Sequence, residues 1–329
     1  MTLAFAVLVA LAAQAQQPNF DNVQMDVQHV QGNVYMISGA GFNSAVQVGK
    51  DGVLVVDTMP APLAPKLLAE IRKLSSGPIL WLINTHSHAD HVGGNLVISK
   101  AAVPVVDPFP SLNLTAADAG VTGVGVRGAP GLQPLKIVAH ENVLNRLTEK
   151  APGQTSLPEA ALPRDEYSTR YKDLHTNGEA IILYHEPNAH TDGDSGVLFR
   201  GSDVVVTGDI FTPGGYPFID VDHGGSIQGQ IDALNHILEL TIPVKTQEGG
   251  TAVIPGHGRL SDEADVVEYR DMVVIVRDRI QDLIKKGRTL EQIRASRPTL
   301  DYDVEYVTPN SFVTADAFVE SVYRSLTKK

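Results

Sequence analysis

Histidine and aspartate are concentrated in one short segment, HSHADH at residues 86–91. In extended backbone, side chains two residues apart point to the same side, so His86 and His88 can reach one metal ion. A turn after the second histidine would direct Asp90 and His91 towards a second position nearby. Imidazole nitrogens and carboxylate oxygens are good ligands for Zn²⁺. Four such groups within six residues favour a metal site over a polar surface loop with unrelated histidines.

Three further candidate ligands occur later in the chain, each in a turn-rich context. They are His190 in NAHTDGDS, Asp209 in VTGDIF and His257 in IPGHG. Glycine and turn residues beside them let backbone and ligand approach a metal closely. Taken singly, each would more often be an ordinary loop residue. Together with segment 86–91, they complete a set of five histidines and two aspartates.

The elements that must position these residues follow from hydrophobic periodicity and turn signals. Strands are predicted at residues 27–30, 33–38, 43–48, 52–57, 79–83, 135–138, 181–186, 196–199, 204–208 and 251–255. Helices are predicted at residues 62–74, 141–149, 227–240 and 265–286, and Thr314 is expected to cap a final helix. The candidate ligands stand where predicted strands end. Strands followed by helices in two successive rounds indicate an α/β protein with two packed sheets and helices outside, in one domain.

The chain resembles the metallo-β-lactamase fold superfamily from about Val27 to Gly258, and segment 86–91 matches its HxHxDH motif. The resemblance implies an αββα sandwich of the metallo-β-lactamase type, to which we add a helical C-terminal extension. It also implies two metal ions per chain. The resemblance further implies the role of each ligand. His86, His88 and His190 would bind the first ion, Asp90, His91 and His257 would bind the second, and Asp209 would bridge the two.

Composition narrows the chemistry further. The 329 residues include no cysteine, which excludes disulfides, thiolate nucleophiles and cysteine-ligated zinc. Superfamily β-lactamases that use two zinc ions place Cys or Ser at the position matched by Asp209, so the ligand set here is instead similar to that of glyoxalase II and lactonases. The formal charge of −12 and the lack of basic clusters argue against a nucleic-acid partner. A small-molecule substrate is expected.

The resemblance therefore predicts a zinc-dependent hydrolase, with two Zn²⁺ per chain and iron or manganese as alternative metals. A hydroxide bridging the metals would attack an acyl C–N, C–O or C–S bond of a β-lactam, lactone or thioester. Asp90 would be both ligand and proton shuttle. The stretch GDIF…GGYPFIDVDHGGS also resembles periplasmic quinoprotein-relay or β-lactamase-like proteins. Two alternatives stay open: an iron dioxygenase-like member with one metal, and a non-catalytic metal-binding accessory of a periplasmic quinoprotein system.

Several other residues are weaker candidates for the site. Asp57 ends a predicted buried strand and would either orient the ligand segment or cap the strand. Tyr216 and His223 would line the pocket or complete an oxyanion site. His140 is expected at the start of a helix, and the serine of GDS at residues 193–195 is expected to be a turn residue. Four histidines without partner spacing are predicted to be structural: His29, His175, His185 and His236.

The predicted domain organisation begins with a signal peptide at residues 1–15, since an apolar run precedes Ala-Gln-Ala. The run is too short for a permanent membrane helix, so no membrane span is expected after cleavage, and the mature protein is expected to be periplasmic or secreted. An N-terminal extension (16–26) and the main domain (27–260) follow. Inserted loops are predicted at about 107–134 and 151–176, and a helical extension at 261–329 that packs on the same domain.

Overall fold

The computed structural model describes residues 19–102, 105–106, 132–133, 135–149, 157–308 and 311–328. The predicted signal peptide at residues 1–15 lies outside this range. So do most of the first predicted inserted loop and residues 151–156 of the second. Among the described residues, no helix combines the length and the apolar character needed to cross a lipid bilayer.

The first sheet has seven strands, antiparallel in one half and parallel in the other. In spatial order these are β1 (Asp26–Gln31), β2 (Val34–Gly39), β3 (Phe42–Val48), β4 (Val53–Val56), β5 (Ile79–Ile83), β8 (Lys136–His140) and β9 (Asp165–Tyr167). The first four form antiparallel hairpins, whereas β4, β5, β8 and β9 run parallel. Parallel strands need crossover connections, which α1 (Ala64–Leu74) supplies between β4 and β5. Two short strands, β6 (Val105–Val106) and β7 (Leu132–Gln133), pair separately.

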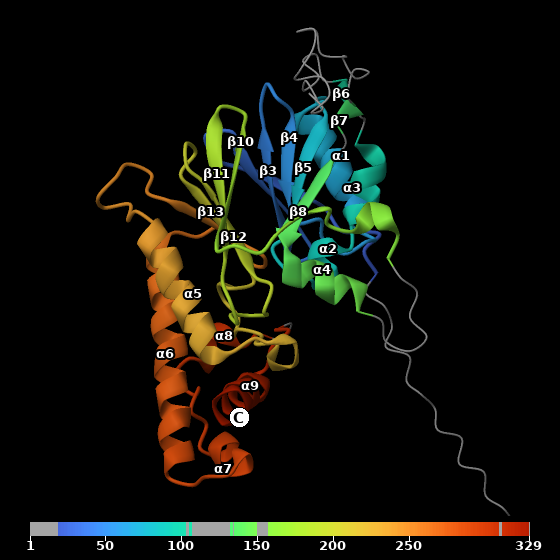
Figure 1. The fold of residues 1–329 in the computed structure, drawn as a ribbon. Coiled ribbons are helices and arrows are strands. Elements are labelled where there is room, and N and C mark those ends of the chain that lie inside the picture. The colour runs from blue at the N-terminus through green and yellow to red at the C-terminus, as the bar shows by residue number, and fades with distance from the viewer. Residues whose placement is uncertain are drawn as a thin grey trace, which may run out of the picture.

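The second sheet has five strands and packs face to face on the first (Figure 1). Its spatial order is β10 (Tyr171–Thr176), β11 (Glu179–His185), β12 (Ser195–Phe199), β13 (Val204–Gly208) and β14 (Ala252–Pro255). Only the β13–β14 pair is parallel. A core cluster between the sheets joins apolar side chains of both, such as Val56 and Ile83 of the first with Val197 and Ile254 of the second.

Helices cover the outer face of each sheet, which completes an αββα sandwich (Figure 1). Over the first sheet, α1 and α3 (Asn95–Ala101) share a core cluster with β4 and β5. Two other short helices, α2 (Ala89–Val92) and α4 (Glu141–Thr148), follow β5 and β8 in the chain. As predicted, His140 stands at the start of α4, where its Nδ1 accepts a hydrogen bond from the backbone N–H of Asn142.

Helices of the C-terminal third cover the second sheet. There α5 (Ile227–Leu240), α6 (Glu263–Lys285) and α9 (Ala315–Thr327) form one core cluster with β11 and β13. The side chain of Thr314 caps α9, as the sequence predicts. The shorter elements of this region and of the β8–β10 connection are α7 (Leu290–Ala295), α8 (Asp303–Tyr306), η1 (Glu159–Ala161) and η2 (Val221–His223).

The prediction of an inserted loop through residue 176 is wrong for residues 165–167 and 171–176. These residues form β9 and β10, which are edge strands of the two sheets. Edge strands are partly solvated, so they carry polar side chains, and in β10 Leu174 is the only buried apolar residue. Because most of their side chains are polar, the two strands show no alternation of apolar and polar residues and cannot be predicted from hydrophobic periodicity.

Candidate metal centre

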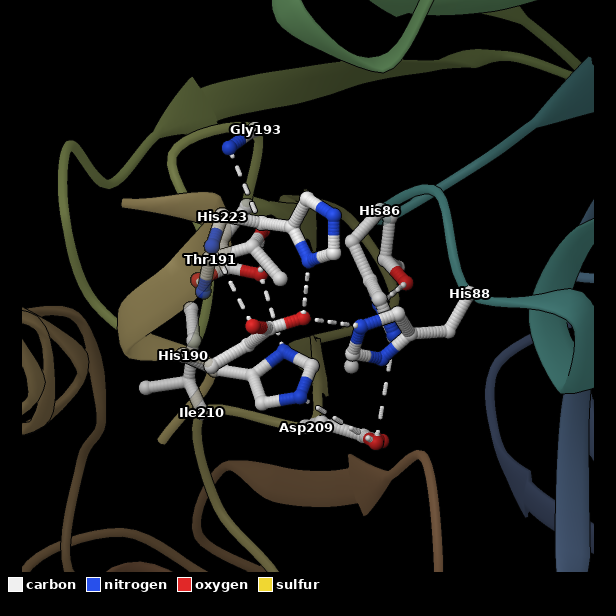
Figure 2. A network of polar contacts seen from close by, with 12 residues as sticks. His86, His88, His190, Thr191, Gly193, Asp209, Ile210 and His223 are labelled. Atoms are coloured by element: carbon white, nitrogen blue, oxygen red, sulfur yellow. Dashed lines mark hydrogen bonds and ion pairs between the residues drawn. The ribbon is translucent and has the colours of Figure 1, made fainter. Parts of the chain in front are cut away.

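The seven predicted ligands converge at one end of the sandwich, on loops and one short helix that follow strands. His86 and His88 lie in the loop after β5, and Asp90 and His91 lie in α2 directly behind it. His190 lies between β11 and β12, Asp209 directly follows β13, and His257 lies just after β14. Figure 2 shows His86, His88, His190 and Asp209 pointing towards one another.

The seven side chains form two groups that adjoin at Asp209. Ligand atoms of His86, His88, His190 and Asp209 lie within 4.8 Å of one another, as do those of Asp90, His91 and His257. Oδ2 of Asp209 is 3.9 Å from Nε2 of His86 and 4.0 Å from Nε2 of His190 in the first group. It is 3.3 Å from Nε2 of His257 in the second, while Oδ1 is 3.3 Å from Nε2 of His91. The position of Asp209 between the groups is the one that a bridging ligand requires.

Each of the five histidines is oriented by a hydrogen bond from the ring nitrogen that faces away from the centre. The acceptors are Thr85 Oγ1 for His86 (3.0 Å), Asp220 Oδ2 for His88 (3.0 Å), Asp57 Oδ2 for His91 (2.8 Å), Asp194 Oδ1 for His190 (3.3 Å) and the carbonyl oxygen of Gly41 for His257 (2.9 Å). Such bonds fix the tautomer and ring orientation of metal-binding histidines. They leave Nε2 of four rings, and Nδ1 of His88, directed at the centre.

Atoms at the centre meet the requirements of metal ligands. Nε2 of His86, His91 and His190 and Oδ1 of Asp209 are buried and have no hydrogen-bond partner among the described residues. A buried polar atom without a partner costs about 1–3 kcal/mol, and coordination to a metal would remove that cost. Gly256 also packs tightly against the centre, because a Cβ there would lie 2.2 Å from Oδ1 of Asp209. The nitrogen and oxygen donors suit zinc.

The charges in the centre depend on burial and on Asp209. Burial, assisted by the neighbouring histidines, holds the pKa of His86 well below its ordinary value, so this ring is neutral as a metal ligand must be. Burial would raise the pKa of Asp209, but His257 and His91 outweigh it and hold that pKa well below the usual range. Burial likewise opposes protonation of His257, yet Asp209 raises its pKa to about 10. A metal ion bound by His257 would take the place of the proton that Asp209 favours there.

Asp57 holds the loop before α1 against the ligand segment. Its Oδ1 accepts the backbone N–H of Thr85 at 2.8 Å, and its Oδ2 accepts the Thr85 hydroxyl at 2.7 Å as well as His91. Asp57 and Met59 both have φ near +60°, a conformation that is strained for residues other than glycine. The Asp57 side chain therefore contacts one ligand directly and, through Thr85, a second ligand, His86.

We expect Asp57→Asn to weaken zinc binding at His91 by about 10- to 100-fold, because the amide has one accepting oxygen in place of two and cannot accept both the backbone N–H of Thr85 and Nδ1 of His91. Competition with a chromophoric zinc chelator measures this affinity. Asp26→Asn, at an exposed position of β1, serves as the control and should leave it unchanged. Equal zinc affinity in Asp57→Asn and wild type would show that Asp57 only caps its strand.

Asp220 is a site residue that the sequence analysis missed. Its Oδ2 accepts from Nε2 of His88 and, at 2.6 Å, from Nδ1 of His223, and these bonds hold its pKa below the usual range despite the opposing effect of burial. Among the described residues, the side chain of His223 is connected to the centre through Asp220, and its ring is half exposed. The DVDH sequence at residues 220–223 contains both groups, but its spacing does not indicate which ligand they contact.

Tyr216 does not line the site, so that prediction is wrong. The side chain is buried in the core cluster of the second sheet, where its ring stacks on Tyr306 and Phe318 at centroid distances of 5.4 and 5.0 Å. Its hydroxyl donates to Oδ1 of Asp303 at 2.9 Å. The C-terminal helices enclose the ring of Tyr216. Nothing in the loop sequence around Tyr216 indicates this packing.

The serine of the GDS sequence is not the turn residue that was predicted, because Ser195 is the first residue of β12. Ser195 is buried, and its hydroxyl accepts a hydrogen bond from the hydroxyl of Tyr167 at 2.7 Å. The preceding Asp194 orients His190 and accepts the backbone N–H of Thr191 at 2.6 Å. This segment therefore orients one of the candidate ligands, His190.

Comparison with known proteins relates both the fold and the ligand segment to one family. A family model described as the metallo-beta-lactamase superfamily matches residues 30–257. The matched range contains all seven predicted ligands and ends at His257.

Several solved structures share the fold at low sequence identity. The sec-alkylsulfatase Pisa1 from Pseudomonas sp. aligns with a TM-score of 0.63 and 16% identity, covering 91% of this chain and 50% of the sulfatase. The chain thus spans about half the length of that protein. A metallo-beta-lactamase from Pontibacter korlensis aligns with a TM-score of 0.53 and 14% identity, covering 76% of this chain and 99% of that protein. The DIM-1 metallo-beta-lactamase gives 0.51 and 16%, with 77% and 98% covered.

Proposed function

Since the chain belongs to the metallo-β-lactamase superfamily, we propose that it is an exported, zinc-dependent hydrolase. Its substrate would be a small molecule with an acyl C–N, C–O or C–S bond, as in a β-lactam, lactone or thioester. The observation that carries the proposal is the position of Asp209, whose carboxylate adjoins both groups of ligands. Two metal ions held side by side would stabilise both the attacking and the leaving group, which fits a hydrolytic reaction.

Zinc ions in these two groups would lower the pKa of a shared water molecule and polarise the carbonyl group of the substrate. The side chains of the protein fix the positions and the charge of the ligands. Asp209 stays ionised between the groups, and the hydrogen bonds of Asp57, Asp194 and Asp220 keep three of the rings in place.

Asp90 is the residue that we assign to proton transfer. Its side chain is 32% exposed, whereas His91 beside it is buried. Oδ2 of Asp90 lies 3.3 Å from Nε2 of His257. Burial acts against ionisation, but the hydrogen bond from His257 and the charge of His91 hold the pKa of Asp90 below its ordinary value. The carboxylate is thus ionised at neutral pH, close to solvent, and placed to accept a proton and pass it to a leaving group.

Metal analysis combined with a substrate panel tests the proposal. The purified full-length chain should contain about two zinc ions and should hydrolyse one class among β-lactams, lactones and thioesters, with phosphoesters as the negative class. Removal of the metal with a chelator should abolish activity, and added zinc should restore it. One iron per chain with oxygen consumption would instead identify the dioxygenase-like alternative. Bound zinc without turnover of any class would favour a non-catalytic accessory.

Export is a separate part of the proposal and needs its own measurement. Expression of the full-length chain in a bacterium, followed by fractionation and N-terminal sequencing, should place the mature protein in the periplasm or medium with residue 16 at its start. Retention of Met1 on cytoplasmic protein would contradict it.

A further inference from the structure

An exposed aromatic side chain stands directly beside the first group of metal ligands. The ring of Phe218 lies 5.9 Å from that of His88 and 5.8 Å from that of His190, measured between centroids. Phe218 is nevertheless 41% exposed. One part of the ring therefore covers the ligands, and another part stays in contact with water.

The C-terminal extension supplies a second ring at the same place. Phe312, in the segment before α9, is 88% exposed, and its ring meets Phe218 edge to face at 5.8 Å. The two residues are far apart in sequence, so their contact depends on the packing of the extension against the main domain. Exposed apolar side chains that gather at one place commonly mark a binding site.

The exposure of Phe218 does not come from a loose loop. Its neighbours Pro217 and Ile219 are buried, and Tyr216 anchors the segment in the core of the C-terminal helices. On the other side, the backbone N–H of Asp220 donates to the carbonyl oxygen of His190 at 2.9 Å. The backbone thus presents the ring of Phe218 at the metal centre while the residues on both sides are fixed.

We propose that Phe218 and Phe312 form an apolar clamp that binds an alkyl chain or aromatic ring of the substrate beside the metal centre. The inference rests on the proposed function and narrows it to substrates with an apolar group next to the bond that is cleaved. Ligand pockets typically combine such apolar walls with a few polar groups that fix orientation. Here the polar groups are the metal ligands and the apolar wall is the pair of phenyl rings.

Two series of compounds of increasing chain length test the clamp. The first is binding of alkanoates from acetate to decanoate to the zinc-loaded full-length chain, measured by calorimetry, which does not depend on turnover. The second is kcat/KM for thioesters or esters with the same acyl chains. In the wild type, affinity and kcat/KM should each rise by about two- to threefold per methylene, somewhat less than full burial of each group would give.

Phe312→Ala and Phe218→Ala should both flatten this dependence on chain length, and Phe312→Leu should retain part of it. Tyr171→Ala is the matched control, because it removes another exposed aromatic ring, one that contacts His236 of α5. Its chain-length dependence should equal that of the wild type. Using two alanine variants keeps the test valid if one of them folds poorly.

Two results would overturn the clamp. The first is that alkanoate affinity and kcat/KM do not depend on chain length in the wild type, or that both alanine variants keep the wild-type dependence. The other is a dimer, detected by sedimentation, that Phe312→Ala dissociates, because a second copy of the chain would then cover the rings. If alkanoate binding depends on chain length and on both rings but no acyl substrate is hydrolysed, the proposed function fails while the clamp stands. If an acyl substrate is hydrolysed but neither binding nor kcat/KM depends on chain length, the proposed function stands and the clamp fails.

Discussion

Asp209→Ala is expected to lower bound zinc from about two ions per chain to one or fewer and to reduce hydrolysis by at least about 10³-fold, which corresponds to several kcal/mol of lost transition-state stabilisation. The reason is the position of its carboxylate, 3.3 Å from Nε2 of His91 through one oxygen and 3.3 Å from Nε2 of His257 through the other. Elemental analysis of the purified variant and kcat/KM on the best substrate of the panel measure both effects.

Two further variants sharpen this result. Asp209→Asn keeps the shape of the side chain but offers one oxygen in place of two, so it should also lose the second ion. Asp232→Ala removes an aspartate from the exposed face of α5 and should leave zinc content and activity unchanged. Full occupancy by two zinc ions in Asp209→Ala would show that Asp209 does not bridge the metals.

Tyr216→Ala is expected to destabilise the protein by about 3–5 kcal/mol, as truncation of a buried aromatic residue typically does. The lost contacts are the stacking on Tyr306 and Phe318, which joins the loop after Asp209 to the C-terminal helices. Urea unfolding followed by circular dichroism measures the change. Since Phe218 lies two residues away, the variant should also weaken the dependence of kcat/KM on substrate chain length.

A comparison with Tyr216→Phe separates the structural role from a role in the pocket. This variant keeps the stacked ring and loses the hydroxyl group that donates to the carboxylate of Asp303, so it should cost about 1.5–3 kcal/mol. Its kcat and KM should match the wild type. A large fall in kcat with unchanged stability would instead place the hydroxyl in the active site, as the sequence analysis predicted.

Local patterns explain why much of the fold could be predicted from the sequence. The helix at Ile227–Leu240 and the strand at Ile79–Ile83 have the predicted bounds, because their apolar residues repeat with the period of the element or fill it completely. The edge strands β9 and β10 were missed, because strands that are partly solvated lack that signal. The hydrophobic pattern of a segment therefore predicts its secondary structure only where one or both of its faces are buried.

The sequence by itself indicated which residues gather in the candidate metal centre. Four candidate ligands occur within residues 86–91, glycine and turn residues flank the other three, and the resemblance to the superfamily implied how the seven divide between two ions. Only the tertiary structure decided which groups surround those ligands. Asp220 orients His88 from 132 positions away, Tyr216 is enclosed by the C-terminal helices, and Phe312 reaches Phe218. Metal ligands can be recognised in a sequence because only a few residue types can bind a metal ion. The residues that surround the ligands cannot be recognised in this way, because many residue types can fill those positions and the packing of distant segments decides which ones do.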